Sequence, residues 1–136
     1  MRIEQRELRV ATRARRETIN VTELVEEIVR EAGVRRGLCL VHVPHATAAL
    51  VVNEDEEGLR RDVLAWISRA FPDDGVWEHN RVDDNASAHL ASLTLGSSAI
   101  LPIESGRLVR GTWQELLLIE LDGPRTRRIH VTVIGE

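Results

Sequence analysis

Lysine is absent from this 136-residue chain, so all 18 of its basic residues are arginine. This absence excludes an enzyme that forms a Schiff base through a lysine amine and one that uses lysine as its general base. Tyrosine is also absent, and phenylalanine occurs once. The chain therefore lacks the aromatic residues of a surface that stacks single-stranded bases, and no nucleic-acid partner is expected. Any chemistry must come from histidine, acidic, hydroxyl or arginine side chains, or from a bound metal.

Cysteine occurs once, at Cys39, and no run of eighteen apolar residues is present. A single cysteine cannot form an internal disulfide, and its apolar surroundings in the run 37–41 favour a small buried hydrophobe over a catalytic thiol. The first residues contain no apolar signal core. We therefore expect no membrane partner and a cytoplasmic location. The net charge of −4 is too small to suggest a polyanion as partner.

The length fits one domain over residues 1–136, and the contents of 43% apolar and 29% charged residues are ordinary for a globular protein. Hydrophobic periodicity predicts three helices: one from Asn20 or Thr22 to Ala32, one over Leu59–Ala70, and one from Asp84 or Asn85 to about Leu95. Short runs rich in β-forming residues predict strands over about 3–13, 38–43, 48–52, 98–103, 116–121 and 128–134. The last two are expected to pair as an antiparallel hairpin, and the fold class is α+β with a mixed or mostly antiparallel sheet.

Three histidines, His45, His79 and His89, each lie in a polar cluster beside a break in regular structure. Imidazole exchanges protons near neutral pH and binds divalent metals, and three neutral imidazoles with an open position suit a catalytic Zn²⁺ or a similar ion. We expect the three to converge on one pocket, where they act as metal ligands or as acid and base. The alternative is that each is a loop histidine satisfied by the backbone.

Several other residues could bind a substrate in this pocket. Thr47 and the amides around it could hold an anion, and so could Ser97 and Ser98 after Gly96. Asn85 lies four residues before His89, so the pair shares a helix face as a ligand and its orienting partner, or simply as a solvated face. Trp113 could wall the pocket or pack in the core. Arg125 presents a donor fork suited to phosphate or carboxylate, or forms a salt bridge with Glu120 or Asp122.

Taken together, these residues resemble the YjbQ family, which is also called the secondary thiamine-phosphate synthase family. The resemblance extends from about Ile3 to Val133. It rests on the following residues, in the family's order and approximate spacing: His45-x-Thr47-Ala48-Ala49, Asn53-Glu54, Asp62, His79, Asn85-x-x-x-His89, Gly96-Ser97-Ser98, Pro102, Gly106, Gly111-Thr112-Trp113-Gln114 and Glu120-x-Asp122-Gly123-Pro124-Arg125.

The resemblance implies a β-sandwich-like core with two to three helices, assembled as a homotrimer. It implies a pocket lined by His45, His79 and His89, with Zn²⁺ or Mg²⁺ as the metal. It also implies thiamine phosphate synthase activity, as a secondary activity beside an unknown main role. This transfer joins a hydroxymethylpyrimidine diphosphate to a thiazole phosphate and releases pyrophosphate. Two positions depart from the family's pattern. Ala46 stands where a hydroxyl residue is common, and Arg110 stands where an apolar residue is common.

Two functions from different classes are therefore expected. The first is a transferase that acts on a small phosphorylated substrate with His45, His79, His89 and Arg125 as catalytic residues. The second is a housekeeping protein that binds a metal or a small phosphorylated ligand without significant catalysis. An enzyme should lose turnover while keeping ligand affinity when one histidine is changed, whereas a binding module should lose only affinity.

Overall fold

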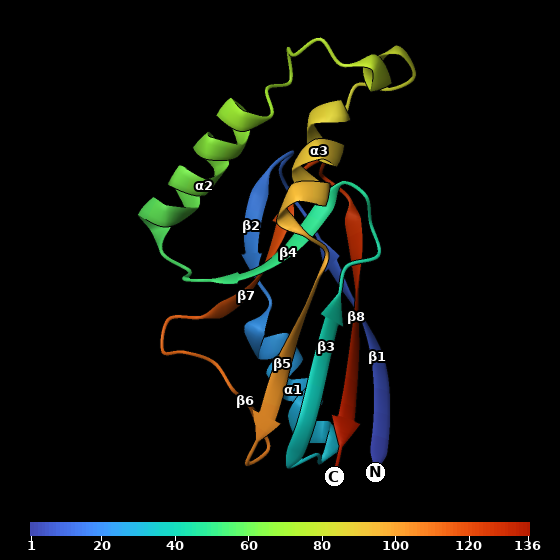
Figure 1. Cartoon of the computed structure of the whole chain (residues 1–136), viewed down its shortest axis with the longest axis vertical. Helices are drawn as coiled ribbons and strands as arrows, with labels where there is room; N and C mark the ends of the chain where they lie inside the picture. The colour runs from blue at the N-terminus through green and yellow to red at the C-terminus, as the bar shows by residue number, and fades with distance from the viewer.

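The structure is a computed structural model that describes residues 1–136. Its elements, in chain order, are β1 (Arg2–Ala11), β2 (Glu17–Asn20), α1 (Thr22–Ala32), β3 (Arg36–His42), β4 (Ala48–Asn53), α2 (Glu57–Ala70), the 3-10 helix η1 (Glu78–Arg81), α3 (Ala86–Leu95), β5 (Ser98–Glu104), β6 (Arg107–Leu108), β7 (Glu115–Glu120) and β8 (Thr126–Gly135). Figure 1 shows α1 behind the long strands, with α2 and α3 at the opposite end of the molecule.

Two antiparallel sheets form the framework. The larger has the strand order β1-β8-β3-β5-β6, and the smaller has the order β2-β7-β4. The main hydrophobic core lies between α1 and the inner faces of both sheets, while a second core joins α2 and α3 to the other face of the smaller sheet. The predicted α+β class with a mostly antiparallel, sandwich-like core and three α-helices is confirmed.

The position of strand β7 between the two cores explains why its sequence is a continuous apolar run. Leu116 and Leu118 point into the main core, whereas Leu117 and Ile119 point into the second core. A strand with both faces buried needs apolar side chains at successive positions instead of alternate ones. Cys39 lies in the main core with no exposed surface, and burial raises the pKa of its thiol to about 12. The expectation of a buried, unreactive cysteine agrees with this position.

The predicted C-terminal hairpin is wrong. Strand β7 pairs with β2 and β4, whereas β8 pairs with β1 and β3 in the other sheet. The turn at Asp122–Arg125 therefore carries the chain from one sheet to the other. A turn motif between two β-rich runs specifies a change of direction, but it does not specify which strands become neighbours. Strands β2 and β6 were not expected, because four and two residues carry too little periodicity to detect.

Two helix starts differ from the predicted caps. Neither Asn20 nor Thr22 caps α1 with its side chain; Val21 is at the cap position, and Asn20 accepts a hydrogen bond from the Thr22 amide at 3.0 Å. Asn85 does occupy the cap position of α3, but its side chain makes no capping bond. That side chain is free for the interactions described below. None of the helices is long and apolar enough to span a membrane.

Candidate functional site

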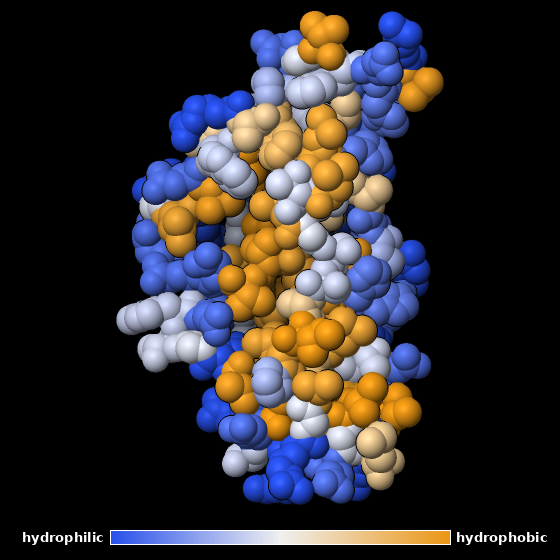
Figure 2. Space-filling view, viewed as in Figure 1, coloured by the Kyte–Doolittle hydropathy of each residue, from blue (hydrophilic) through white to orange (hydrophobic).

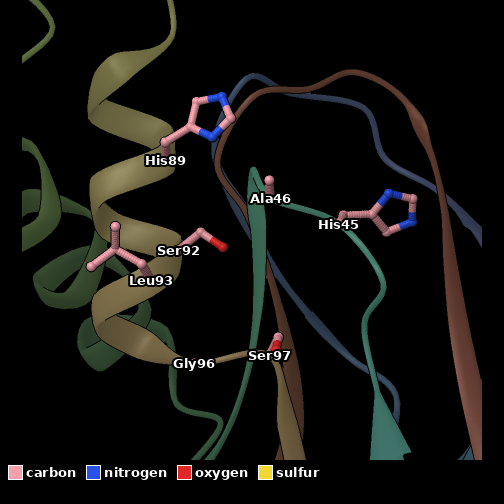
Figure 3. A pocket seen from close by; sticks show the side chains of 7 residues that line it. All are labelled: His45, Ala46, His89, Ser92, Leu93, Gly96 and Ser97. Carbon is pink, nitrogen blue, oxygen red and sulfur yellow. The ribbon is translucent and has the colours of Figure 1, made fainter. Parts of the chain in front are cut away.

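His89 separates two clefts on the side of α3. The first, of about 360 Å³, is lined by the loop after β3 and the end of α3: His45, Ala46, His89, Ser92, Leu93, Gly96 and Ser97. The second, of about 320 Å³, is bordered by η1 and the start of α3, and its lining includes His79 and His89. Figure 3 shows His89 and Ser92 projecting from α3 toward the loop that carries Ala46, with Ser97 beneath them. A molecule in either cleft would therefore meet the His89 ring.

A chain of side-chain hydrogen bonds orients the His79 ring. Nε2 of His79 lies 3.0 Å from Oδ1 of Asn85, and Nδ2 of Asn85 donates to Oδ2 of Asp122 at 2.9 Å. The same Asp122 oxygen accepts a bond from Nη2 of Arg125 at 2.9 Å. Asn85 and Asp122 are buried, whereas His79 and Arg125 are exposed. Three separate segments, at η1, α3 and the turn after β7, are thus joined at this point.

This series of hydrogen bonds also determines which nitrogen of His79 carries the proton. A carboxylate only accepts hydrogen bonds, so the Asn85 group that faces Asp122 must be the amide NH₂. The Asn85 oxygen therefore faces His79 and requires a donor, which places the proton of a neutral ring on Nε2. Nδ1 then carries a free lone pair. The His79 and His89 rings meet edge to face, with centroids 4.6 Å apart.

His45 is oriented by a different strand. The backbone amide of Arg128 in β8 donates to Nε2 of His45 at 2.9 Å, so a neutral His45 ring carries its proton on Nδ1. Partial burial and the positive charges of Arg127 and Arg128 lower the pKa of His45 below its usual value. Figure 3 shows the His45 ring turned to the side of its loop away from α3. It borders the first cleft without pointing at His89.

A buried ion pair supports this end of the molecule. Glu120 has no exposed surface, and its carboxylate binds the Arg127 guanidinium with a closest N–O distance of 2.5 Å. Oε1 of Glu120 also accepts from the Thr12 hydroxyl at 2.7 Å, and Arg127 donates to both oxygens of Thr47 at 2.9 Å. Burial raises the pKa of Glu120, but the bonds from Arg127 and Thr12 outweigh it and hold that pKa below its ordinary range.

The predicted substrate-binding residues occupy different environments. Thr47 is buried, with its hydroxyl bonded to Arg127, and Ser97 lines the first cleft. Ser98 is exposed on β5, and Trp113, 70% exposed, lies on the loop between β6 and β7 and lines neither histidine cleft. The sequence interpretation did not assign Asp122 and Ser92 to the site. The salt bridge between Arg125 and Asp122, one of the alternatives that the sequence offers for Arg125, is present in the structure.

The expected three-histidine metal site is wrong. His79 and His89 are neighbours, but the His45 ring is committed to the backbone of β8. No group of three or more histidine, cysteine, aspartate or glutamate side chains is placed to hold a metal ion. The residues present do not fit the expected ligand set, so no catalytic step is assigned to a metal here. Binding of Zn²⁺ or Mg²⁺ by the protein in solution stays a prediction.

The chain is similar in sequence and in structure to proteins of one family. Residues 6–136 match the family described as UPF0047 protein YjbQ-like. A UPF0047 protein from Archaeoglobus fulgidus is 46% identical over 94% of this chain and 99% of its own length. A YbjQ-like protein of unknown function from Sulfolobus solfataricus P2 has a crystal structure that superposes with a TM-score of 0.97 at 43% identity, covering 99% of each chain. A hypothetical protein from Aeropyrum pernix K1 gives a TM-score of 0.96 at 42% identity, covering 98% of this chain and 99% of its own.

These findings correct the expected activity. The relatives and solved structures carry only family names or descriptions of unknown function, and nothing in them supports thiamine biosynthesis or a transferase. The prediction of thiamine phosphate synthase activity is therefore wrong, together with the metal site that would have assisted it. The family prediction itself is confirmed, since both the sequence match and the structural match extend over nearly the whole chain. The chain belongs to the YjbQ-like UPF0047 protein family.

Proposed function

We propose that the histidine clefts bind a small phosphate-bearing molecule and that His79 and His89 exchange a proton with it. The observation that carries this proposal is the series of hydrogen bonds that runs from Arg125 through Asp122 and Asn85 to His79. Two buried polar side chains are used to orient one exposed imidazole. An exposed ring needs no such support for stability, whereas a general acid or base must be held in one tautomer and one direction.

Two arginines near His45 favour an anion at this end of α3, although they line neither cleft and the acidic Glu78 lines the second one. The side chains of Arg125 and Arg128 are about half exposed, at 54% and 47%. Both act on His45, since their positive charges contribute to the lowering of its pKa. Guanidinium groups bind phosphate through paired N–H donors, and Nη1 of Arg125 is not used by Asp122. The hydrogen bonds through Asp122 and Asn85 connect Arg125 to His79, so we place the phosphate between this arginine and the His79 ring.

Each imidazole has a distinct role in this proposal. His89 borders both clefts and would contact the ligand directly. His79 presents a free Nδ1 lone pair and would accept or return a proton at that atom. The surroundings of His45 lower its pKa and so favour its neutral form, which would donate a hydrogen bond from Nδ1. Ser97, at the base of the first cleft, adds a hydroxyl donor.

The first experiment is a titration with inorganic phosphate, followed through the imidazole C–H signals in NMR spectra at constant ionic strength. We expect the signals of His89 and His79 to shift saturably, and the signal of His130, which lies on β8 beside Glu7, to stay in place. Arg125→Gln should weaken phosphate binding by about tenfold or more, because it removes a charged donor. Arg107→Gln, at an exposed position on β6, is the matched control.

Catalysis is tested separately with a panel of phosphomonoesters and diphosphates, followed by phosphorus NMR. His89→Gln should abolish any conversion while phosphate still binds. If phosphate produces no saturable shift at His79 or His89, the proposed site is wrong. If probes bind but none is converted by the wild-type protein, the acid–base role is wrong and the site belongs to a binding protein.

We also propose that the chain assembles as a homo-oligomer, with the trimer taken from the family resemblance. The outer face of the larger sheet, on the side away from α1, exposes Ile3, Leu38, Ile100 and Ile134 by 36–65%. Ile134 pairs directly with both Ile3 and Leu38, so three of these side chains are contiguous. Figure 2 shows an apolar area over this part of the molecule. A second copy of the chain would remove this area from water.

A further inference from the structure

A third cavity, of about 220 Å³, lies between α2 and the face of the smaller sheet that α2 covers. Leu59, Val63 and Trp66 line it from one face of α2, and the sheet contributes mainly Val51, Leu117 and Ile119. Only Ile67 of the whole helix is buried. An amphipathic helix is normally stabilised by packing its apolar face on a core. Here most of that face borders unfilled space, and Figure 1 shows α2 standing away from the sheet.

One hydroxyl in this cavity has no partner. Thr18 is 8% exposed, lines the cavity, and its Oγ1 atom is buried without any hydrogen bond. Thr18 lies opposite Ile119 in the pairing of β2 with β7, so the two side chains share the face that α2 covers. A buried hydroxyl costs stability unless it is bonded. An unpaired hydroxyl that lines an apolar cavity is available to bond to a ligand.

The polar rim of the cavity has one unused charge. Asp55 is paired with Arg60, and Nη1 of Arg60 donates to the Thr18 carbonyl at 3.1 Å. Glu56 accepts from the first amides of α2, and Glu57 is paired with Arg61. Glu54 also lines the cavity, but its carboxylate has no ion pair or hydrogen bond. The rim therefore has one uncompensated negative charge.

We propose that this cavity binds a small amphipathic amine. Its apolar body would fill the space between α2 and the sheet, and its ammonium group would pair with Glu54 and donate a second hydrogen bond to the Thr18 hydroxyl. Trp66 is 46% exposed, so its ring offers a face on which a cation is attracted. A carboxylate-bearing ligand is disfavoured, because Arg60 is already neutralised by Asp55 and Glu54 would repel it. This site is separate from the histidine clefts and does not depend on their function.

The test compares three probes of matched shape: 2-phenylethylamine, 2-phenylethanol and phenylacetate. Binding is followed through the indole N–H signal of Trp66 in NMR spectra, assigned with Trp66→Phe. We expect the amine to shift this signal saturably and to bind at least tenfold more tightly than the alcohol, and we expect no binding of the carboxylate. Crystals grown with the amine should show it beside Glu54.

Three variants test the named contacts. Glu54→Gln should weaken binding of the amine by about tenfold. Glu57→Gln, which changes an exposed acid of the same segment, should leave the affinity for the amine unchanged. Thr18→Val removes the unpaired hydroxyl and keeps the side chain at equal size. It should therefore raise the melting temperature of the free protein and weaken binding of the amine. Val63→Phe should fill the cavity and block binding while the protein stays folded.

Several outcomes would overturn the proposal. These are equal binding of the alcohol and the amine, equal effects of Glu54→Gln and Glu57→Gln, or the absence of a saturable Trp66 shift with any probe. A crystal structure in which a side chain of a second copy occupies the cavity would overturn it as well. Phosphate binding at the histidines is measured at different signals, so the failure of one site does not affect the other.

Discussion

Glu120 is a carboxylate that stays charged without any contact with water. Its partners are the Arg127 guanidinium, the Thr12 hydroxyl and two backbone amides. Because these bonds hold its pKa below the ordinary value near 4.3 that it has in the unfolded chain, the pair contributes stability above that pH. The contribution is lost as the pH falls through the lowered pKa of the folded state. Acid should therefore weaken this end of the molecule.

Glu120→Gln should lower the free energy of unfolding by about 3 kcal/mol at neutral pH, because it leaves the Arg127 charge buried without a counter-charge. The variant should also lose less stability than the wild type as the pH falls below about 4.3. Urea unfolding at a series of pH values measures both effects. Glu57→Gln, in an exposed pair with Arg61, should change stability little. A Glu120→Gln protein as stable as the wild type at pH 7 would contradict the prediction.

Between elements, Arg110 connects α1 to the segment before β7. Glu26 is a buried carboxylate of α1, and Nε of Arg110 lies 3.6 Å from its Oε1 atom. Arg110 also binds Glu115 at 3.3 Å and the Gln114 carbonyl. The arginine thus supplies the counter-charge for Glu26. This accounts for a charged residue directly before the Gly111-Thr112-Trp113-Gln114 motif.

Arg110→Leu should destabilise the protein by roughly 3 kcal/mol, because the Glu26 carboxylate would stay buried without its partner. The double variant Glu26→Leu and Arg110→Leu should recover most of the loss, since the charge and its counter-charge are then both absent. Thermal and urea unfolding of the wild type, Glu26→Leu, Arg110→Leu and the double variant give a double-mutant cycle that measures this coupling. Additive effects of the two substitutions would show that the residues do not depend on each other.

The elements themselves were largely predictable from the sequence, but their neighbours were not. Local patterns located α1, α2, α3 and the longer strands, because hydrophobic periodicity and apolar runs are both readable within a short stretch of sequence. The separation of β7 from β8 depends on pairings with β2 and β1, which lie at the other end of the sequence. The same limit applied to the site. His79, Asn85, His89 and Arg125 were recognised by residue type, whereas the link through Asp122 requires three segments in contact.

For the whole molecule, light scattering at micromolar concentration should give the mass of an oligomer, with a trimer expected. Leu38→Glu should reduce that mass, because it places a charge in the contiguous apolar area of the larger sheet's outer face. Val82→Glu, at an exposed position in the loop between η1 and α3, is the control and should leave the mass unchanged. A monomer mass for the wild-type protein would refute assembly.

The pairing of β1 with β8 places Arg2 opposite Gly135, so the first and last strands of the chain lie side by side. This contact encloses nearly the entire chain in one loop. The chain must lose the conformational entropy of that loop before the two strands can stabilise each other. Strand β3 also needs β8 as a neighbour, so the larger sheet cannot be completed early. Folding should consequently be limited by a late, long-range search, in the range of milliseconds to seconds typical of high contact order.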